Sequence, residues 1–150
     1  MATTFNLFDT YRKTLADPTR AAAVAGTLKL ALFKAVTPDQ NVHDFLNDLV
    51  PGTNEVTGSN YTARGNACAA PTWTMDAAGL ITYDATDPAT WLQHATGFTA
   101  ARRAILYWDT GLDATSTLVG YSNDFGADAS NIAADVSVAF AAAGIYTAPR

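Results

Sequence analysis

The chain has 150 residues, of which 49% are hydrophobic and 15% are charged, and its formal net charge is −5. The length suits one domain, so we expect residues 1–150 to form a single unit, with an N-terminal helical segment at 1–26 and a β-rich body at 27–150. Apart from the Arg102–Arg103 pair, the basic residues are scattered along the chain. The lack of a basic patch argues against a direct nucleic-acid partner.

The longest apolar stretches fall far short of the ~18 residues that a membrane span needs, and the N-terminus lacks the pattern of a signal peptide. We therefore expect a soluble protein that is made in a cytoplasm and has no membrane partner. Its charged share is below the roughly 25% of an average soluble protein. A surface with few charges loses less on burial against a neighbouring protein, although a compositional habit of the source organism explains it equally well.

The first predicted element is a helix with an aromatic face. Phe5, Phe8, Tyr11 and Leu15 follow one another at steps of three and four, and Asp17–Pro18 ends the pattern. The aromatic face needs a cover, which is either the sheet of the same domain or a neighbouring subunit. We therefore treat Phe5, Phe8 and Tyr11 as candidate interaction residues.

A strand and a second helix are predicted next. Residues 27–33 alternate in the manner of a strand. Val42, Phe45 and Leu49 share one face of a short amphipathic helix, which Pro51–Gly52 stops.

This helix, the loop 52–60 and the residue after the loop supply further candidate interaction residues, which are Phe45, Leu49, Asn54 and Tyr61. The alternative is that both predicted helices only cap the sheet.

From residue 53 onward, turn residues recur at short intervals and the hydrophobic period becomes that of strands. The expected strands are 55–57, one that begins at 61, 71–76 and 80–83 as a hairpin, 104–108 and 117–121 as a second hairpin, and 135–140. The predicted fold is mainly β (α+β), as an antiparallel β-sandwich or a partly open barrel with an N-terminal helix and one short internal helix.

Asp109-Thr-Gly111 follows an apolar strand, as the catalytic triplet of aspartic proteases does. However, a chain of this length needs a dimer to supply the second aspartate, and Leu112 stands where Ala or Ser is usual. The triplet is also common in hairpin turns. We expect a turn, and a protease that uses Asp109 is a remote alternative.

No other group of residues predicts chemistry. His43 and His94 have no metal ligand at a suitable spacing, and Cys68 has no partner for a disulfide or for catalysis. The acidic residues between 44 and 55 lack the spacing of a calcium loop. We expect no catalytic residue, no cofactor and no metal.

Several motifs, in one order along residues 5–146, resemble a family of small virion proteins of tailed bacteriophages. They are Leu28-Lys-Leu-Ala-Leu-Phe33, Pro38-Asp-Gln-Asn-Val-His-Asp-Phe-Leu-Asn-Asp48, Asn54-Glu-Val-Thr-Gly-Ser-Asn-Tyr-Thr-Ala-Arg-Gly65, Ala104-Ile-Leu-Tyr-Trp-Asp-Thr-Gly111, Leu118-Val-Gly-Tyr-Ser-Asn-Asp-Phe-Gly126 and Phe140-Ala-Ala-Ala-Gly-Ile145. The chain departs from the family pattern at Ala69–Pro71.

The resemblance implies a structural protein of the phage head surface, made in the bacterial host cytoplasm. In particular, it implies a decoration or cement protein that binds the outer surface of the major capsid protein lattice and self-associates as a trimer. A head fibre base, a tail protein or a connector is the alternative within the same resemblance.

Overall fold

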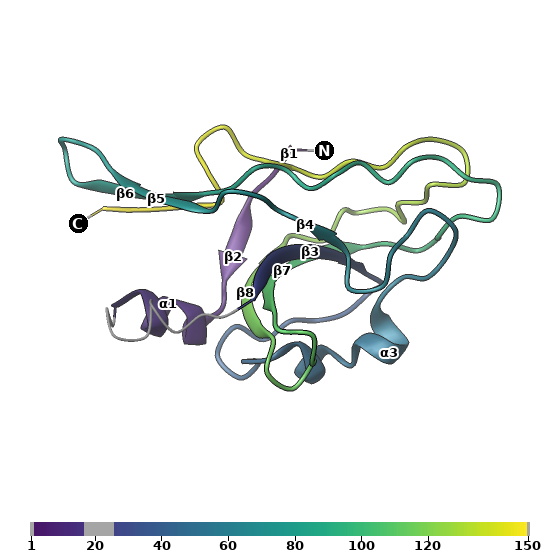
Figure 1. Ribbon diagram of the computed structural model, residues 1–150, viewed down its shortest axis with the longest axis horizontal. Helices are drawn as coiled ribbons and strands as arrows, with labels where there is room; N and C mark the ends of the chain where they lie inside the picture. The colour runs from purple at the N-terminus through teal and green to yellow at the C-terminus, as the bar shows by residue number, and fades with distance from the viewer. Residues whose placement is uncertain (1, 17–25, 150) are drawn as a thin grey trace.

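The computed structural model describes residues 2–16 and 26–149 (Figure 1). Its elements are β1 (Ala2–Thr3), β2 (Phe5–Leu7), α1 (Asp9–Ala16), β3 (Thr27–Phe33), η1 (Leu46–Leu49, a 3-10 turn), α3 (Pro51–Asn54), β4 (Asn66–Ala67), β5 (Thr72–Met75), β6 (Leu80–Asp84), β7 (Arg103–Asp109), β8 (Thr117–Ser122), β9 (Ala139–Phe140) and β10 (Tyr146–Pro149). The mainly β class predicted from the sequence is confirmed, whereas the sandwich or open-barrel detail is not.

The central layer is an antiparallel sheet of five strands in the order β2-β8-β7-β3-β4. Two of its three inner strands, β3 and β7, are apolar on both faces, because the sheet is covered on both sides. Along β3, Leu28, Leu30 and Leu32 belong to a large hydrophobic cluster on one face, and Ala31 and Phe33 belong to a smaller cluster on the other. The predicted strand 27–33 and the predicted hairpin 104–121 are both confirmed.

Different parts of the chain cover the two faces. The smaller cluster is closed by Phe8 and by Leu46 and Leu49 of η1. The larger cluster is closed by long segments of irregular chain that carry Trp91 and Phe98. The sheet is therefore held between one helical and one loop-rich layer.

The prediction of a helix that includes Phe5 is wrong. Phe5–Leu7 form β2, which pairs with β8 so that Phe5 lies opposite Ser122, and α1 begins only at Asp9. Phe5 and Leu7 are buried while Asn6 is exposed, so the period here is two rather than three. The predicted end of this helix at Asp17–Pro18 lies outside the described residues.

The predicted internal helix is shorter than expected. Only Leu46–Leu49 form a 3-10 turn, and the Asp48 carboxylate begins it by accepting the backbone N–H groups of Asp44 and Phe45. Pro51 does not stop a helix; it occupies the first turn of α3, where its missing N–H costs nothing.

Three further predicted strands are corrected. Glu55 makes a single bridge to Phe33, and the chain from 57 to 65 turns instead of extending. Of the predicted strand 135–140, only Ala139–Phe140 is a strand, and it pairs with β1. β10, which pairs with β6 near the end of the chain, was not predicted from the sequence.

The predicted hairpin 71–83 is confirmed and forms, with β10, an antiparallel sheet of three strands in the order β10-β6-β5. We call these strands and the turn 76–79 the β-arm. In Figure 1 the β-arm extends to the left beyond the central sheet, with the turn at its far end and α1 below it. β10 lies beside β2 on one edge of this sheet, while β5 forms the other edge.

Candidate functional site

Most of the predicted interaction residues lie inside the folded chain. Phe5, Phe8 and Tyr11 are 7%, 0% and 3% exposed, and Leu49 of η1 is also buried. Phe8 packs against Tyr121 at a ring-centre distance of 5.1 Å. The aromatic face is therefore covered by the chain's own residues, and as folded here these side chains offer no surface to a partner.

The other predicted residues differ among themselves. Phe45 is 39% exposed and remains accessible. The Asn54 side-chain amide donates to the backbone carbonyl of Leu49 at 2.8 Å. Tyr61 is partly buried, and its hydroxyl accepts a hydrogen bond from the backbone of β3. Only Phe45 thus keeps the free apolar surface expected of a contact residue.

The outer edge of β3 is sealed by the segment 54–68. The backbone N–H of Val56 donates to the Leu32 carbonyl, and that of Cys68 donates to the Leu28 carbonyl. Between these points the Leu32 N–H finds no backbone partner and donates to the Tyr61 hydroxyl at 3.0 Å. A tyrosine side chain thus supplies the bond that a neighbouring strand would otherwise make.

Gly65 is required at this edge. Its φ of +68° is in the left-handed region, and a Cβ there would lie 2.1 Å from the backbone oxygen of Leu30. Only glycine lets the segment approach β3 so closely.

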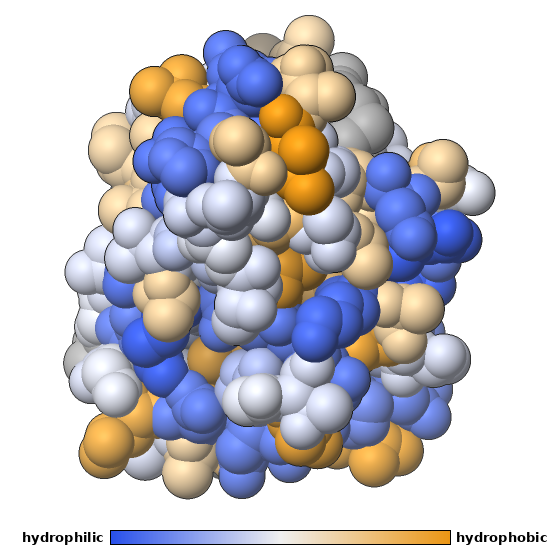
Figure 2. All heavy atoms as spheres, turned by 90° about the vertical axis from the view of Figure 1, so that its right-hand side faces the viewer, coloured by the Kyte–Doolittle hydropathy of each residue, from blue (hydrophilic) through white to orange (hydrophobic). Residues whose placement is uncertain are grey.

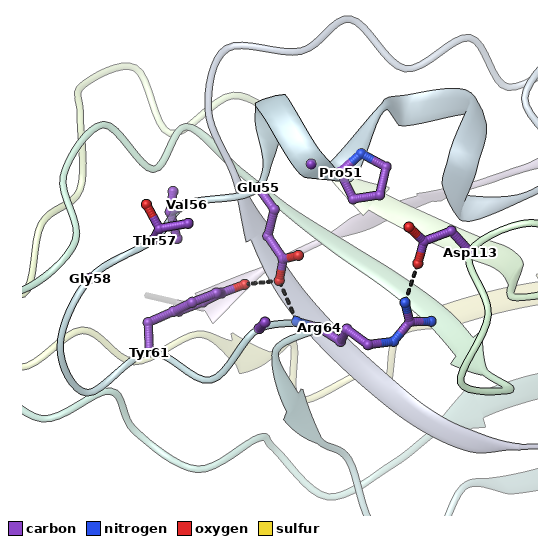
Figure 3. Close-up of a pocket in the computed structure, with 10 residues that line it drawn as sticks. Pro51, Glu55, Val56, Thr57, Gly58, Tyr61, Arg64 and Asp113 are labelled. Carbon is purple, nitrogen blue, oxygen red and sulfur yellow. Dashed lines mark hydrogen bonds and ion pairs between the residues drawn. The ribbon is translucent and has the colours of Figure 1, made fainter.

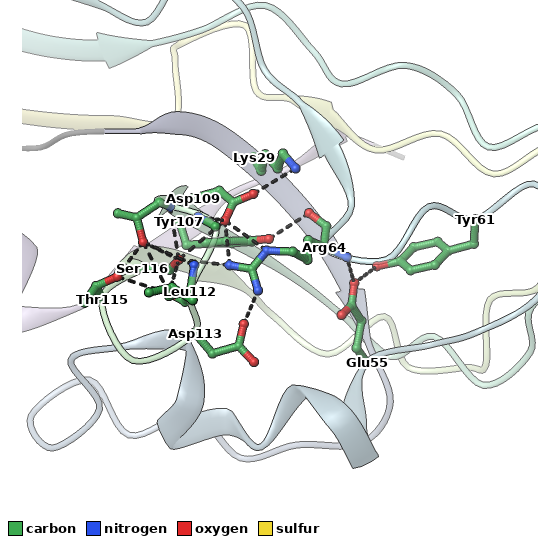
Figure 4. A network of polar contacts seen from close by, with 12 residues as sticks. Lys29, Glu55, Tyr61, Arg64, Tyr107, Asp109, Leu112, Asp113, Thr115 and Ser116 are labelled. Atoms are coloured by element: carbon green, nitrogen blue, oxygen red, sulfur yellow. Dashed lines mark hydrogen bonds and ion pairs between the residues drawn. The ribbon is translucent and has the colours of Figure 1, made fainter.

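Beside this edge, Arg64 is the centre of a polar network (Figure 4). Its Nε donates to Asp109 Oδ1 at 2.9 Å, one Nη donates to Ser116 at 3.0 Å, and the guanidinium also pairs with Asp113. Lys29 Nζ lies 2.8 Å from the other oxygen of Asp109. The network joins the loop before β4 to the turn between β7 and β8.

The network determines the protonation state of Asp109, whose side chain is only 8% exposed. Burial by itself would raise the pKa of Asp109, but hydrogen bonds from Arg64 and Lys29 outweigh burial and hold this pKa well below its usual range. The carboxylate is therefore ionised and bound on both oxygens. As predicted, Asp109-Thr-Gly111 begins a turn, in which Gly111 N–H donates to Asp109 at 2.9 Å.

A shallow hollow of about 310 Å³ opens next to the network (Figure 3). In it, Glu55 Oε1 accepts hydrogen bonds from the Tyr61 hydroxyl and from the Arg64 backbone N–H, each at 2.7 Å. Burial is the main cause of the raised pKa of Glu55, and these two bonds oppose it. The hollow's polar groups mostly bind one another, so they hold the loop in place and leave few donors for a ligand.

The remaining candidates for chemistry are held in local contacts. His43 Nδ1 accepts the Asp39 backbone N–H, and His94 Nδ1 accepts the Thr96 backbone N–H. Cys68 is 2% exposed, and burial raises the pKa of its thiol to about 12. Within residues 2–16 and 26–149, no group of three His, Cys, Asp or Glu side chains could hold a metal ion. In the same ranges, no helix is long and apolar enough to cross a membrane.

The most exposed apolar group on a regular element lies on the β-arm and was not predicted from the sequence. Trp73, Met75 and Leu80 are 43%, 60% and 40% exposed, and the whole of β5 is exposed. Figure 2 shows the face of the molecule away from the β-arm, where hydrophobic residues form small separate groups among hydrophilic ones. The alternation of Trp73 and Met75 with threonines was visible in the sequence, but their exposure depends on the position of the hairpin outside the body.

No protein-family model, curated protein or solved structure matches this chain. The resemblance to virion proteins of tailed phages therefore stays a prediction, and its consequences are taken up as a proposal.

Proposed function

We propose that this chain is a structural protein of a tailed-phage virion that decorates the head. It binds the outer surface of the major capsid protein lattice, associates with further copies of itself and carries out no reaction. A protein that binds the mature lattice better than the immature one stabilises the head by its binding free energy.

The observation that carries the proposal is a contrast between two sets of side chains. The polar side chains that a reaction could use are engaged with one another, whereas apolar side chains that could contact a partner are exposed. The polar groups that a reaction could use are bound to one another, as in the network of Arg64 and Asp109. In contrast, Trp73, Met75 and Leu80 on the β-arm are 40% to 60% exposed. Exposed apolar side chains at the end of a projecting sheet suit recognition of a protein surface.

The environment of Asp109 also supports a structural role for this residue over the protease alternative. A catalytic pair of aspartates shares one proton, which requires one carboxyl group to be neutral. Asp109 is instead bound by Lys29 and Arg64, which favour its ionised form.

The copy number of the chain in purified particles tests the proposal. Hundreds of copies per virion are expected for a head decoration protein, whereas about six or twelve copies indicate the neck or tail alternative. Absence from the finished particle refutes both. An Asp109→Asn variant that stops the purified chain from hydrolysing a substrate would instead show the enzyme.

A further inference from the structure

On the outer edge of β5, backbone groups have no partner among the described residues. The Asp76 N–H donates to the Leu80 carbonyl, so residues 72, 74 and 76 direct their backbone groups toward β6. Because the direction alternates along a strand, the N–H and C=O groups of Trp73 and Met75 point to the outer edge. Among the described residues, none forms a backbone hydrogen bond with this edge.

This edge lacks several of the devices that prevent strand pairing. Such devices are very short edge strands, charged side chains, prolines, bulges and covering segments; β5 is short and has Pro71 and Asp76 at its two ends, but its own residues carry none of the others. Thr72–Met75 contain neither charge nor proline, and all four residues are exposed. The edge of β3 in the same molecule, by contrast, is fully covered by the segment 54–68. An extended polypeptide strand is therefore the chemical partner that fits β5.

We propose that β5 pairs with β5 of a second copy of this chain, antiparallel and about a two-fold axis at Thr74. The two copies then form one six-stranded sheet in the order β10-β6-β5-β5-β6-β10. This inference does not depend on the proposed function, and it is distinct from the three-fold clustering that the resemblance implies.

The hydrogen-bond pattern selects this register. With Thr74 opposite itself, Trp73 of each copy lies opposite Met75 of the other. Each such pair exchanges two N–H···O=C bonds, so all outward backbone groups of Trp73 and Met75 are satisfied by four bonds. With Trp73 opposite itself, Met75 would instead face Pro71, which has no N–H to donate.

The side chains also match in this register. Trp73, Met75 and Tyr83 lie on the same face of the β-arm, where Trp73 stacks on Tyr83 at 4.4 Å between ring centres. The pairing adds Met75 of the second copy on the open side of Trp73. A methionine sulfur beside an aromatic ring is a favourable contact, and directly opposite residues are the pairs that stabilise a sheet.

The charges allow the contact. Asp76 and Asp84 are the charged residues of the β-arm. In the proposed register Asp76 lies opposite Thr72, so the two Asp76 residues are four residues apart, about 14 Å at 3.4 Å per residue. That exceeds the Debye length of about 8 Å at physiological salt. No pair of like charges therefore lies directly across the interface.

The contact is small. Two paired four-residue strands bury less than the roughly 1,000 Å² of a stable interface, so we expect a weak, reversible dimer that forms only at high protein concentration. Sedimentation equilibrium of the intact chain from about 10 μM to 1 mM should show a shift from monomer to dimer. Met75→Lys should weaken the dimer about tenfold or more, because it places a charge on the edge. Leu92→Lys, at an exposed leucine outside the β-arm, is the matched control and should change the Kd less than about twofold.

Disulfide trapping tests the register. At the axis, the two Thr74 residues form a non-hydrogen-bonded pair with Cα atoms about 4.5 Å apart, which is within disulfide reach. Thr74→Cys should therefore oxidise to a covalent dimer, while native Cys68 is buried and stays unreacted. Thr72→Cys changes an exposed threonine of the same strand, but its two copies lie about 14 Å apart and should not cross-link.

The outcomes separate cleanly. A monomer–dimer equilibrium that Met75→Lys weakens, with cross-linking at position 74 and not 72, supports the proposal. It is overturned if the chain stays monomeric to 1 mM and Thr74→Cys fails to cross-link, if both cysteine variants cross-link equally, or if the associated species is a trimer that Met75→Lys leaves intact. The copy number in the virion is unaffected by any of these results.

Discussion

Removing the Arg64 side chain should destabilise this protein clearly. Arg64→Ala deletes the cation between Asp109 and Asp113 and a donor to Ser116. Breaking a buried ion pair costs about 3–5 kcal/mol. Here Lys29 remains on Asp109 and the Arg64 side chain is itself 24% exposed, so the cost falls to about 2 kcal/mol.

Thermal unfolding followed by circular dichroism measures this effect. A loss of about 2 kcal/mol corresponds to a decrease in Tm of roughly 4–8 °C for a chain of this size. Arg102→Ala is the matched control, because Arg102 is about as exposed as Arg64 and also pairs with two aspartates, but Asp124 and Asp128 are 35% and 62% exposed whereas Asp109 is 8% exposed. We expect its Tm to change little. Equal decreases in Tm for the two variants would refute the argument that burial of Asp109 makes the Arg64 network more stabilising than a surface network.

The same variant tests the pH dependence. The pKa of Asp109 is lower in the folded than in the unfolded chain, so the unfolded chain binds more protons between the two values. The stabilisation is therefore complete above the unfolded pKa of about 4 and is lost as pH falls through the folded pKa. Arg64→Ala should lose less stability than the parent chain between about pH 5 and pH 2.5. Parallel acid-unfolding curves for the two proteins would contradict this.

Further substitutions test the sealed edge and the buried thiol. Tyr61→Phe leaves the Leu32 N–H without a partner and should cost about 1–3 kcal/mol in urea unfolding, so a change within error contradicts the role of the hydroxyl. Gly65→Ala should lower the free energy of unfolding much more than Gly111→Ala. Both positions have positive φ, but only at Gly65 would a Cβ clash with backbone atoms, so equal losses of stability would disprove that clash. Cys68 should react with a thiol reagent at pH 8 only after unfolding, and rapid labelling of the native chain would refute its burial.

The elements that the sequence predicted well are those whose residues carry the signal locally. The strand 104–108 is a continuous apolar run, which is typical of a strand covered on both faces, and the hairpin 71–83 has a turn between two alternating segments. The first segment was predicted wrongly because Phe5, Phe8 and Tyr11 have helical spacing. In the structure Phe5 belongs to β2, Phe8 connects the two elements and Tyr11 belongs to α1. Burial of all three produces the same sequence pattern as one helical face.

The candidate site could not be predicted in the same way. Arg64 meets Asp109 and Asp113 across separations of 45 and 49 residues, and an isolated arginine before a glycine carries no local sign of such partners. The role of Tyr61 likewise depends on a gap in the bonding of β3 that only the folded sheet creates. Contacts of this kind follow from topology, which periodicity does not specify.

The different treatment of the edges of β3 and β5 favours a contact at β5. Leaving an edge strand open is a hazard for a monomer, because its backbone groups pair readily with other chains. At β3 the fold removes this hazard with a covering segment, the Tyr61 hydroxyl and a glycine at positive φ. The same chain leaves β5 open, with Trp73 and Met75 exposed along it. If β5 had no partner, replacing Met75 with lysine would improve solubility and alter no assembly; if it pairs as proposed, the same change removes the dimer.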